Sequence, residues 1–144
     1  MDYMLRELDD PPESERFAIL GSLMRFNADA LPGPVPRAFA IMIDDAAGAS
    51  AGGLWAVSAY DWLIVEMIFI PPTLRGQGLG AQLMARAEEV AAERGCIGIW
   101  LDTFSFQARG FYEKLGYSLA GTIEDHPIGG ARYFLAKRLS PAPA

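Results

Sequence analysis

A glycine-rich turn between an apolar strand and an amphipathic helix is the feature that most constrains this sequence. The turn reads Arg75-Gly76-Gln77-Gly78-Leu79-Gly80, after the apolar run of residues 62–70 and before a helical pattern over residues 81–94. Alternate glycines leave few side chains, so an anionic ligand can approach backbone N–H groups. The start of a helix adds unpaired donors and the positive end of its dipole, and Arg75 adds a positive charge. The turn therefore predicts a phosphate or pyrophosphate site.

Size and composition predict one globular domain over residues 1–139, followed by a short tail at residues 140–144. A chain of 144 residues with 51% hydrophobic residues can bury an ordinary core and is not a disordered chain. The N-terminus lacks the pattern of a signal peptide, and the apolar stretch at residues 54–70 is too short to span a membrane. We therefore expect a cytoplasmic protein.

The single cysteine, Cys96, cannot form an internal disulfide, which fits a reducing compartment. We expect it to be a small buried hydrophobe rather than a reactive thiol. With one histidine and one cysteine the chain offers no structural zinc site, so no metal is expected.

The net charge of −6 is unevenly distributed along the chain. Residues 1–66 hold eleven acidic and four basic residues, whereas residues 67–144 hold seven and eight. The half that carries the glycine turn is therefore the better suited to an anionic ligand. No basic stripe interleaved with aromatic residues is present, which argues against nucleic acid as a partner.

Apolar periodicity and the positions of glycine and proline predict an α/β fold with the element order β-α-β-β-β-α-β-α-β-β. The connections between the third, fourth and fifth elements are too short for parallel crossovers, and one parallel crossover is expected around residues 62–102. The predicted strands are residues 3–8, 37–44, 54–59, 62–70, 97–102, 117–124 and 132–139. The predicted helices are residues 13–30, 81–94 and 106–115, and residues 46–53 are predicted to be a hairpin connection.

Other ligand classes also use such a turn. A Walker-type nucleotide site needs a Lys-Ser/Thr pair, but Gly80 is followed by Ala81 and Gln82. A dinucleotide fingerprint fits loosely, with Asp102 at the end of the next strand, and would imply a nicotinamide-dependent oxidoreductase. Against it, residues 71–75 separate the strand from the first glycine, and only about 40 residues follow Asp102, too few to finish that fold. A glycine-rich loop without a ligand also stays open.

Two segments together resemble the GNAT superfamily of N-acetyltransferases. Residues 66–80 look like its motif A, and residues 108–117 (Ala-Arg-Gly-Phe-Tyr-Glu-Lys-Leu-Gly-Tyr) look like its motif B. The spacing, element order and length agree over residues 1–139. The resemblance implies a GNAT (acyl-CoA N-acyltransferase) fold: a mixed, mostly antiparallel sheet, splayed at one parallel strand pair, with helices on both faces.

The resemblance also implies that acetyl-CoA binds between the strand ending at Ile70 and the strand beginning at Ile97. Backbone groups of Ile68, Phe69 and Ile70 would pair with pantetheine, and N–H groups from Arg75 to Gly80 would hold the pyrophosphate. Ser105 stands where many relatives carry asparagine before the motif B helix. Two roles stay open for it, a contact to CoA and a cap on that helix.

For catalysis, the resemblance implies direct transfer of the acetyl group to an amine. Tyr112 matches the motif B tyrosine, whose hydroxyl points at the CoA sulfur; the alternative is a tyrosine that only packs. Glu66 interrupts an apolar strand and would act as a general base if buried, or would simply face outward. His126, Asp102 and Asp125 are weaker candidates for contacts to the acceptor.

The expected function is transfer of an acetyl group from acetyl-CoA to a primary amine of a small molecule or peptide. A non-catalytic CoA-binding sensor or interaction module is the alternative. Exposed edge strands and the apolar composition make a homodimer an additional expectation.

Overall fold

A computed structural model describes residues 2–139. The chain divides into two compact units, Met1–Val35 and Pro36–Ala144, and each is described by itself.

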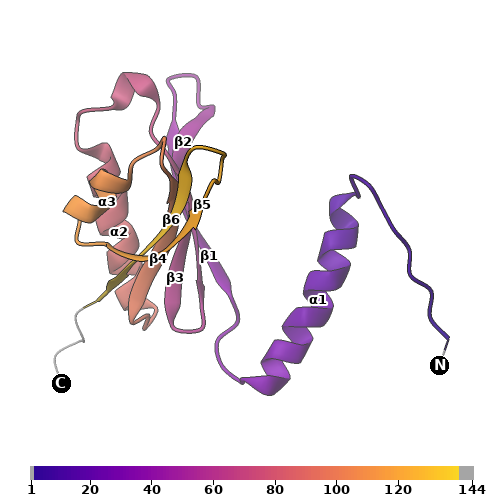
Figure 1. Ribbon diagram of the computed structural model, residues 1–144. Coiled ribbons are helices and arrows are strands. Elements are labelled where there is room, and N and C mark those ends of the chain that lie inside the picture. The colour runs from indigo at the N-terminus through magenta and orange to yellow at the C-terminus, as the bar shows by residue number, and fades with distance from the viewer. Residues whose placement is uncertain (1, 140–144) are drawn as a thin grey trace. The chain divides into compact units, whose positions relative to one another are not determined.

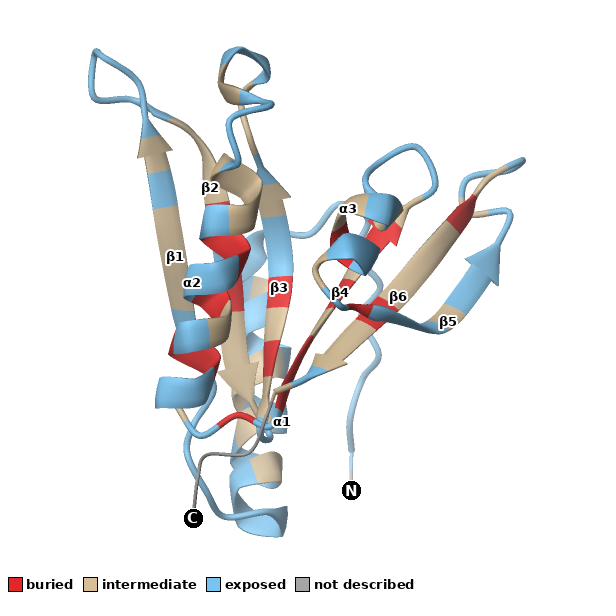
Figure 2. Cartoon of the chain, turned by 90° about the vertical axis from the view of Figure 1, so that its left-hand side faces the viewer, coloured by how far each residue is buried: buried red, intermediate tan, exposed pale blue. Residues whose placement is uncertain are grey.

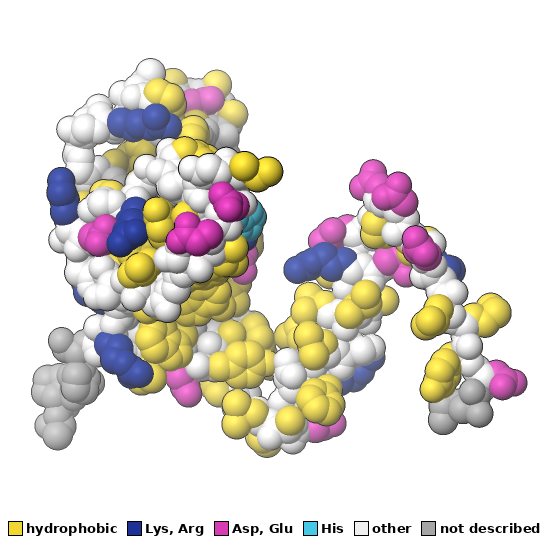
Figure 3. Space-filling view, in the orientation of Figure 1, with side chains coloured by type: hydrophobic (Ala, Val, Ile, Leu, Met, Phe, Trp, Pro, Cys, Tyr) yellow, Lys and Arg dark blue, Asp and Glu magenta, His cyan; other side chains and the backbone are white. Residues whose placement is uncertain are grey.

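The first unit is built on the helix α1, Glu13–Ala30. The helix begins after Pro12, carries two acidic residues in its first turn, and ends where the N–H of Leu31 donates to the carbonyl of Asn27. Its surface carries exposed hydrophobic side chains (Figure 3), namely Phe17, Ile19, Leu23 and Phe26.

The predicted strand over residues 3–8 is wrong, because these residues form no strand. A strand needs a neighbour to complete its hydrogen-bonded ladder, and within the described residues this segment has none. The segment is instead tied to α1 by Arg6, whose Nη2 lies 2.9 Å from Oε1 of Glu15.

The second unit contains a six-stranded sheet with the strand order β1-β2-β3-β4-β6-β5 (Figure 1). Every neighbouring pair is antiparallel except β3 and β4, which confirms the mixed, mostly antiparallel sheet and its parallel crossover. The strands are β1 (Arg37–Asp44), β2 (Ser50–Ala59), β3 (Trp62–Phe69), β4 (Gly98–Phe104), β5 (Ser118–Glu124) and β6 (Ala131–Arg138).

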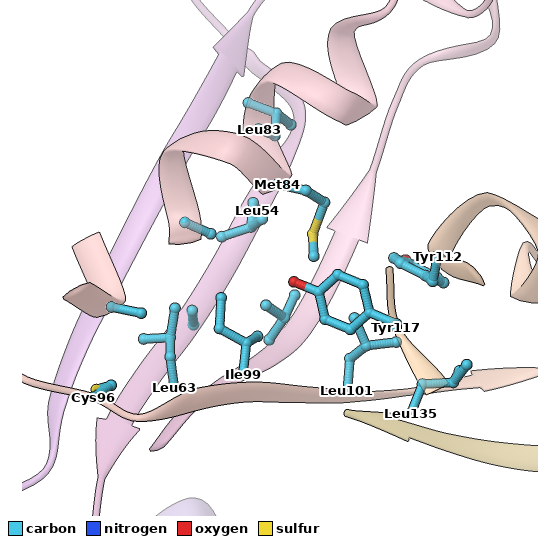
Figure 4. Packing of buried hydrophobic residues seen from close by; sticks show 14 residues of the cluster. Leu54, Leu63, Leu83, Met84, Cys96, Ile99, Leu101, Tyr112, Tyr117 and Leu135 are labelled. Atoms are coloured by element: carbon cyan, nitrogen blue, oxygen red, sulfur yellow. The ribbon is translucent and has the colours of Figure 1, made fainter. Parts of the chain in front are cut away.

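Two helices, α2 (Leu79–Glu93) and α3 (Arg109–Lys114), lie on the same face of this sheet (Figures 1 and 2), and the short 3-10 helix η1 (Pro72–Leu74) precedes α2. The buried stripe of α2 is Leu83, Met84, Ala87, Val90 and Ala91. This stripe packs on sheet residues that include Leu54, Leu63, Ile99, Leu101 and Leu135 (Figure 4). Cys96 is buried in the same core, as expected.

Two predicted boundaries are wrong by several residues. Strand β2 begins at Ser50, so Gly52 and Gly53 belong to the sheet and not to the hairpin connection. Helix α3 begins only at Arg109, because Gln107 is held in the preceding turn, where its Oε1 accepts the backbone N–H of Phe104 at 2.7 Å. Small residues and local side-chain bonds, which periodicity does not register, set both boundaries.

The close approach of β1 and β2 generates a prediction. Gly53 has a φ of 138°, and a Cβ atom there would overlap the carbonyl oxygen of Ile41. We expect Gly53→Ala to lower the free energy of unfolding by about 3 kcal/mol, measured by chemical denaturation. Gly121→Ala is the matched control, because a Cβ at this strand position meets nothing within 4 Å. Equal losses in the two variants would contradict this explanation.

Candidate active site

The centre of the candidate site is a fork between the two parallel strands. β3 and β4 pair through four positions, from Trp62 with Gly98 to Val65 with Leu101, and then separate (Figure 2). Beyond the fork and within residues 2–139, β3 keeps only β2 as its neighbour and β4 keeps only β6. The backbone groups of residues 66–69 that face β4 therefore have no ladder partner in this part of the chain, and an extended ligand could supply one.

Glu66 lies at the fork as the extra residue of a β-bulge. Met67 pairs with Trp55 and Val65 with Ala56, so Glu66 is skipped in the register. Its side chain is exposed, and within residues 2–139 it forms no ion pair or side-chain hydrogen bond. The structure thus agrees with the outward-facing alternative for Glu66 and not with a buried carboxylate.

The glycine turn follows the open end of β3. Gly76 and Gly78 both have a φ of 77°, in the left-handed region that favours glycine. Gly78 is the N-cap of α2 and has no side chain to offer, and the first helical bond runs from Gln82 N–H to Gly78 O. The N–H groups of residues 76–80 donate to no other described residue. They form a group of free donors at a helix start, as the sequence predicts.

Arg75 is tied to the end of β3. Its Nε donates to the carbonyl of Ile70 at 2.9 Å, and its guanidinium lies 5.6 Å from the centre of the Phe69 ring. The residue is exposed, so the remaining guanidinium N–H groups can reach an anion at the turn.

Tyr112 stands on α3 with its ring buried against Phe111 and against Tyr117 (Figure 4). Burial, with a smaller contribution from the Asp102 carboxylate, raises its pKa to about 12. Within residues 2–139, the Tyr112 hydroxyl is not among the fully enclosed side-chain oxygens that lack a hydrogen bond. Tyr112 therefore combines a buried ring with a hydroxyl that is protonated at neutral pH.

The expectation that Ser105 caps α3 is wrong. The N-cap of that helix is Ala108, which has no side-chain cap. The Oγ of Ser105 instead accepts the backbone N–H of Ala131 at 3.1 Å, and its own N–H donates to Ala131 O. Ser105 thus closes the junction between β4 and β6, and its hydroxyl hydrogen is left for another acceptor.

The weaker candidates lie in two places: Asp102 is on β4, and Asp125 and His126 are in the connection between β5 and β6. Asp102 forms an ion pair with Arg132, with Nη2 and Oδ2 2.7 Å apart. His126 packs edge-on against Phe104 at 5.2 Å. Asp125 accepts the backbone N–H of Gly129 and is engaged in its own turn.

A half-buried polar contact that sequence reasoning missed joins α2 and α3. The Nζ of Lys137 donates to the carbonyl of Leu115, at the end of α3, at 2.8 Å and pairs with Glu88 of α2. Burial raises the pKa of the neighbouring Tyr117, helped by the Glu88 charge. The contact fixes α3, and hence Tyr112, relative to α2.

Within residues 2–139 no group of three or more His, Cys, Asp and Glu residues could hold a metal ion. No helix of the described chain is long and apolar enough to cross a membrane.

Comparisons with known proteins agree with this geometry. Residues 3–117 match the family described as the acetyltransferase (GNAT) family. The chain is 33% identical to an acetyltransferase of Agrobacterium fabrum over 96% of its own length and 99% of the relative. It is 45% identical to blasticidin-S acetyltransferase of Streptomyces morookaense over 64% of this chain and 68% of that protein. The crystal structure of an acetyltransferase from Bacillus cereus matches with a TM-score of 0.76 and 30% identity, covering 93% of this chain and 98% of that one.

The raised pKa of Tyr112 makes its contribution to stability pH-dependent. The pKa is about 12 in the folded protein and 10.0 for an unperturbed tyrosine, so the folded state holds this proton more tightly than the unfolded state. The resulting stabilisation is complete below pH 10 and is lost as the pH rises to 12. Between pH 8 and pH 11, we expect the wild type to lose about 1.4 kcal/mol more unfolding free energy than Tyr112→Phe. Parallel losses in chemical denaturation would contradict the buried-ring account.

Proposed function

Because the chain belongs to the GNAT family of acetyltransferases, we propose that it transfers the acetyl group of acetyl-CoA to a primary amine. The observation that carries the proposal is the fork, whose open end is followed directly by a turn of free N–H donors. An extended thiol arm and a pyrophosphate, joined in one molecule, match these two features. Membership of an acetyltransferase family argues against the nicotinamide alternative.

In this proposal the donor lies along β3 as an additional strand. Backbone groups of Ile68, Phe69 and Ile70 pair with the pantetheine arm, while the N–H groups of residues 76–80 hold the pyrophosphate. Arg75 adds charge at the same turn, and the Ser105 hydroxyl donates from the β4 side. Two observations on the described chain support this placement. β3 has no ladder partner on its β4 side beyond Val65, and the N–H groups of the turn donate to no other residue.

The reaction needs one bond formed and one broken. The neutral amine nitrogen attacks the thioester carbon, the C–N bond forms, and the C–S bond breaks to release the CoA thiolate. A backbone N–H near Ile68 stabilises the charge on the carbonyl oxygen. The Tyr112 hydroxyl donates a hydrogen bond to the leaving sulfur, and with its pKa raised to about 12 the phenol is protonated at neutral pH.

The amine must also lose a proton before or during attack. Glu66 is the carboxylate at the fork that has no ion-pair partner within residues 2–139, and its exposure leaves it open to water. We infer that Glu66 accepts the proton either directly or through a water molecule. An exposed carboxylate is suited to passing that proton on to solvent.

The relative named blasticidin-S acetyltransferase favours a small molecule over a peptide as the acceptor. The single domain over residues 1–139, the cytoplasmic location and the homodimer remain predictions.

Binding of the donor can be tested at the turn. Gly78 and Gly48 both have a left-handed backbone, and a Cβ atom at either position would meet nothing within 4 Å. Gly78→Ala changes the glycine turn, whereas Gly48→Ala changes the β1–β2 connection and is the matched control. Each change should cost about 1–2 kcal/mol of stability through backbone strain. Acetyl-CoA at 100 times its Kd should add about 2.7 kcal/mol and raise the Tm by several degrees.

We expect this increase in Tm in the wild type and in Gly48→Ala, and a clearly smaller one in Gly78→Ala. NADH at the same concentration serves as the control ligand. No increase with acetyl-CoA in the wild type would contradict the proposed function.

The role of Tyr112 can be tested by removing its hydroxyl alone. Tyr112→Phe should lower turnover about 10–100-fold with little change in acetyl-CoA affinity, because the ring still packs while the proton donor is lost. Tyr60→Phe, an exposed tyrosine in the β2–β3 turn, is the control. Thiol release from CoA measures the rate, and unchanged turnover in Tyr112→Phe would remove the proton-donor role.

A further inference from the structure

Three aromatic rings and an arginine cluster on β4, β6 and the turn that follows β4, and the proposed chemistry does not use them. The rings of Phe104 and Phe106 are stacked, 5.3 Å apart and inclined by 8°. The Arg132 guanidinium lies 5.2 Å from the centre of the Phe104 ring and 5.4 Å from that of Phe134. We call Phe104, Phe106, Phe134 and Arg132 the aromatic cluster.

The aromatic cluster is outside the hydrophobic core. Along β4, Leu101 and Thr103 are buried, and the residues between and after them, Asp102 and Phe104, belong to the other face of the sheet. Their register partners on β6 are Phe134 and Arg132. The cluster therefore lies on the sheet face opposite α2 and α3.

The outermost ring of the stack is available to a ligand. Phe106 is 71% exposed, although it is a large apolar side chain, and it is held parallel to Phe104. Phe104 is itself held by Arg132 and by the His126 ring, which lies perpendicular to it. A fixed, exposed ring favours another flat group by offset stacking and by contact with a cation.

The charges at the fork favour a cation. Glu66 and Asp102 are the residues that follow the last paired position of the fork, on β3 and β4 respectively. Asp102 is neutralised by Arg132, whereas Glu66 has no ion-pair partner among the described residues. The net charge of this group is therefore negative, which complements a protonated amine.

Building on the proposed function, we propose that the aromatic cluster selects the acceptor, which is a primary amine carried on a flat aromatic or heteroaromatic ring. The ring stacks on Phe106, and the protonated amine is drawn toward Glu66 at the fork before it loses its proton. Phe106 is the specificity-determining residue. The ion pair between Arg132 and Asp102 holds Arg132 against Phe104, on which Phe106 stacks.

The experiment compares probes that differ in one property. 2-Phenylethylamine and 2-cyclohexylethylamine carry the same charge and a similar volume, but only the first has a flat ring. 3-Phenylpropionate has the flat ring with a negative charge. Binding of each probe to the full-length protein with CoA present is measured by calorimetry, and acetyl-CoA-dependent thiol release is measured in parallel.

We expect the flat amine to bind about three- to tenfold more tightly than the cyclohexyl amine, and the anion to bind more weakly than either. Phe106→Leu should reduce the preference for the flat amine to less than twofold, and Phe106→Tyr, which keeps the ring, should retain it. Tyr60→Leu removes an exposed aromatic side chain from the β2–β3 turn and should also retain the preference.

Three results would overturn the inference: no binding of either amine, equal binding of the two amines, or a preference that Phe106→Leu leaves intact. Tighter binding of 3-phenylpropionate would overturn the assigned charge. A preference that depends on Phe106 without any thiol release would support the surface while contradicting the proposed acetyl transfer, so the two failures can be told apart.

Discussion

The end of parallel pairing after Val65 and Leu101 is the constraint on which the rest of the site depends. A β-bulge bends its strand and increases the local twist, and the bulge at Glu66 lies at the position where β3 turns away from β4. From there, β3 runs toward the glycine turn with one edge unpaired. The fork, the exposed carboxylate of Glu66 and the free N–H groups of the glycine turn thus follow one another along the chain, and all three depend on one interruption in the sheet.

The elements around the fork are held by packing as well as by hydrogen bonds. A Cβ atom at Gly80 would lie 3.1 Å from the Phe111 ring, so the absence of a side chain there lets α3 approach the start of α2 closely. At the other end of α3, Lys137 joins the carbonyl of Leu115 to Glu88 on α2. These two contacts fix Tyr112 relative to the turn, which is the preorganisation that acyl transfer requires.

Sequence reasoning predicted the elements whose signals are local and missed those that depend on partners. The glycine turn and the α2 stripe are encoded by neighbouring residues, and the structure has both. The strand expected over residues 3–8 lacks a ladder partner, Ser105 bonds to a residue far along the chain, and the exposure of Glu66 depends on a bulge. The aromatic cluster was missed because Phe104 and Arg132 meet only through the pairing of β4 with β6.

The few pairs that join β3 to β4 also have a mechanical consequence. The sheet consists of two three-stranded ribbons, β1-β2-β3 and β4-β6-β5, joined along a seam of four residue pairs. Bending at this seam disrupts fewer ladder bonds than bending anywhere else in the sheet, so a hinge motion between the ribbons is its softest deformation. A molecule seated between the ribbons would bridge them and stiffen the hinge. Filling the gap would therefore make the whole sheet more rigid, beyond its effect on the site itself.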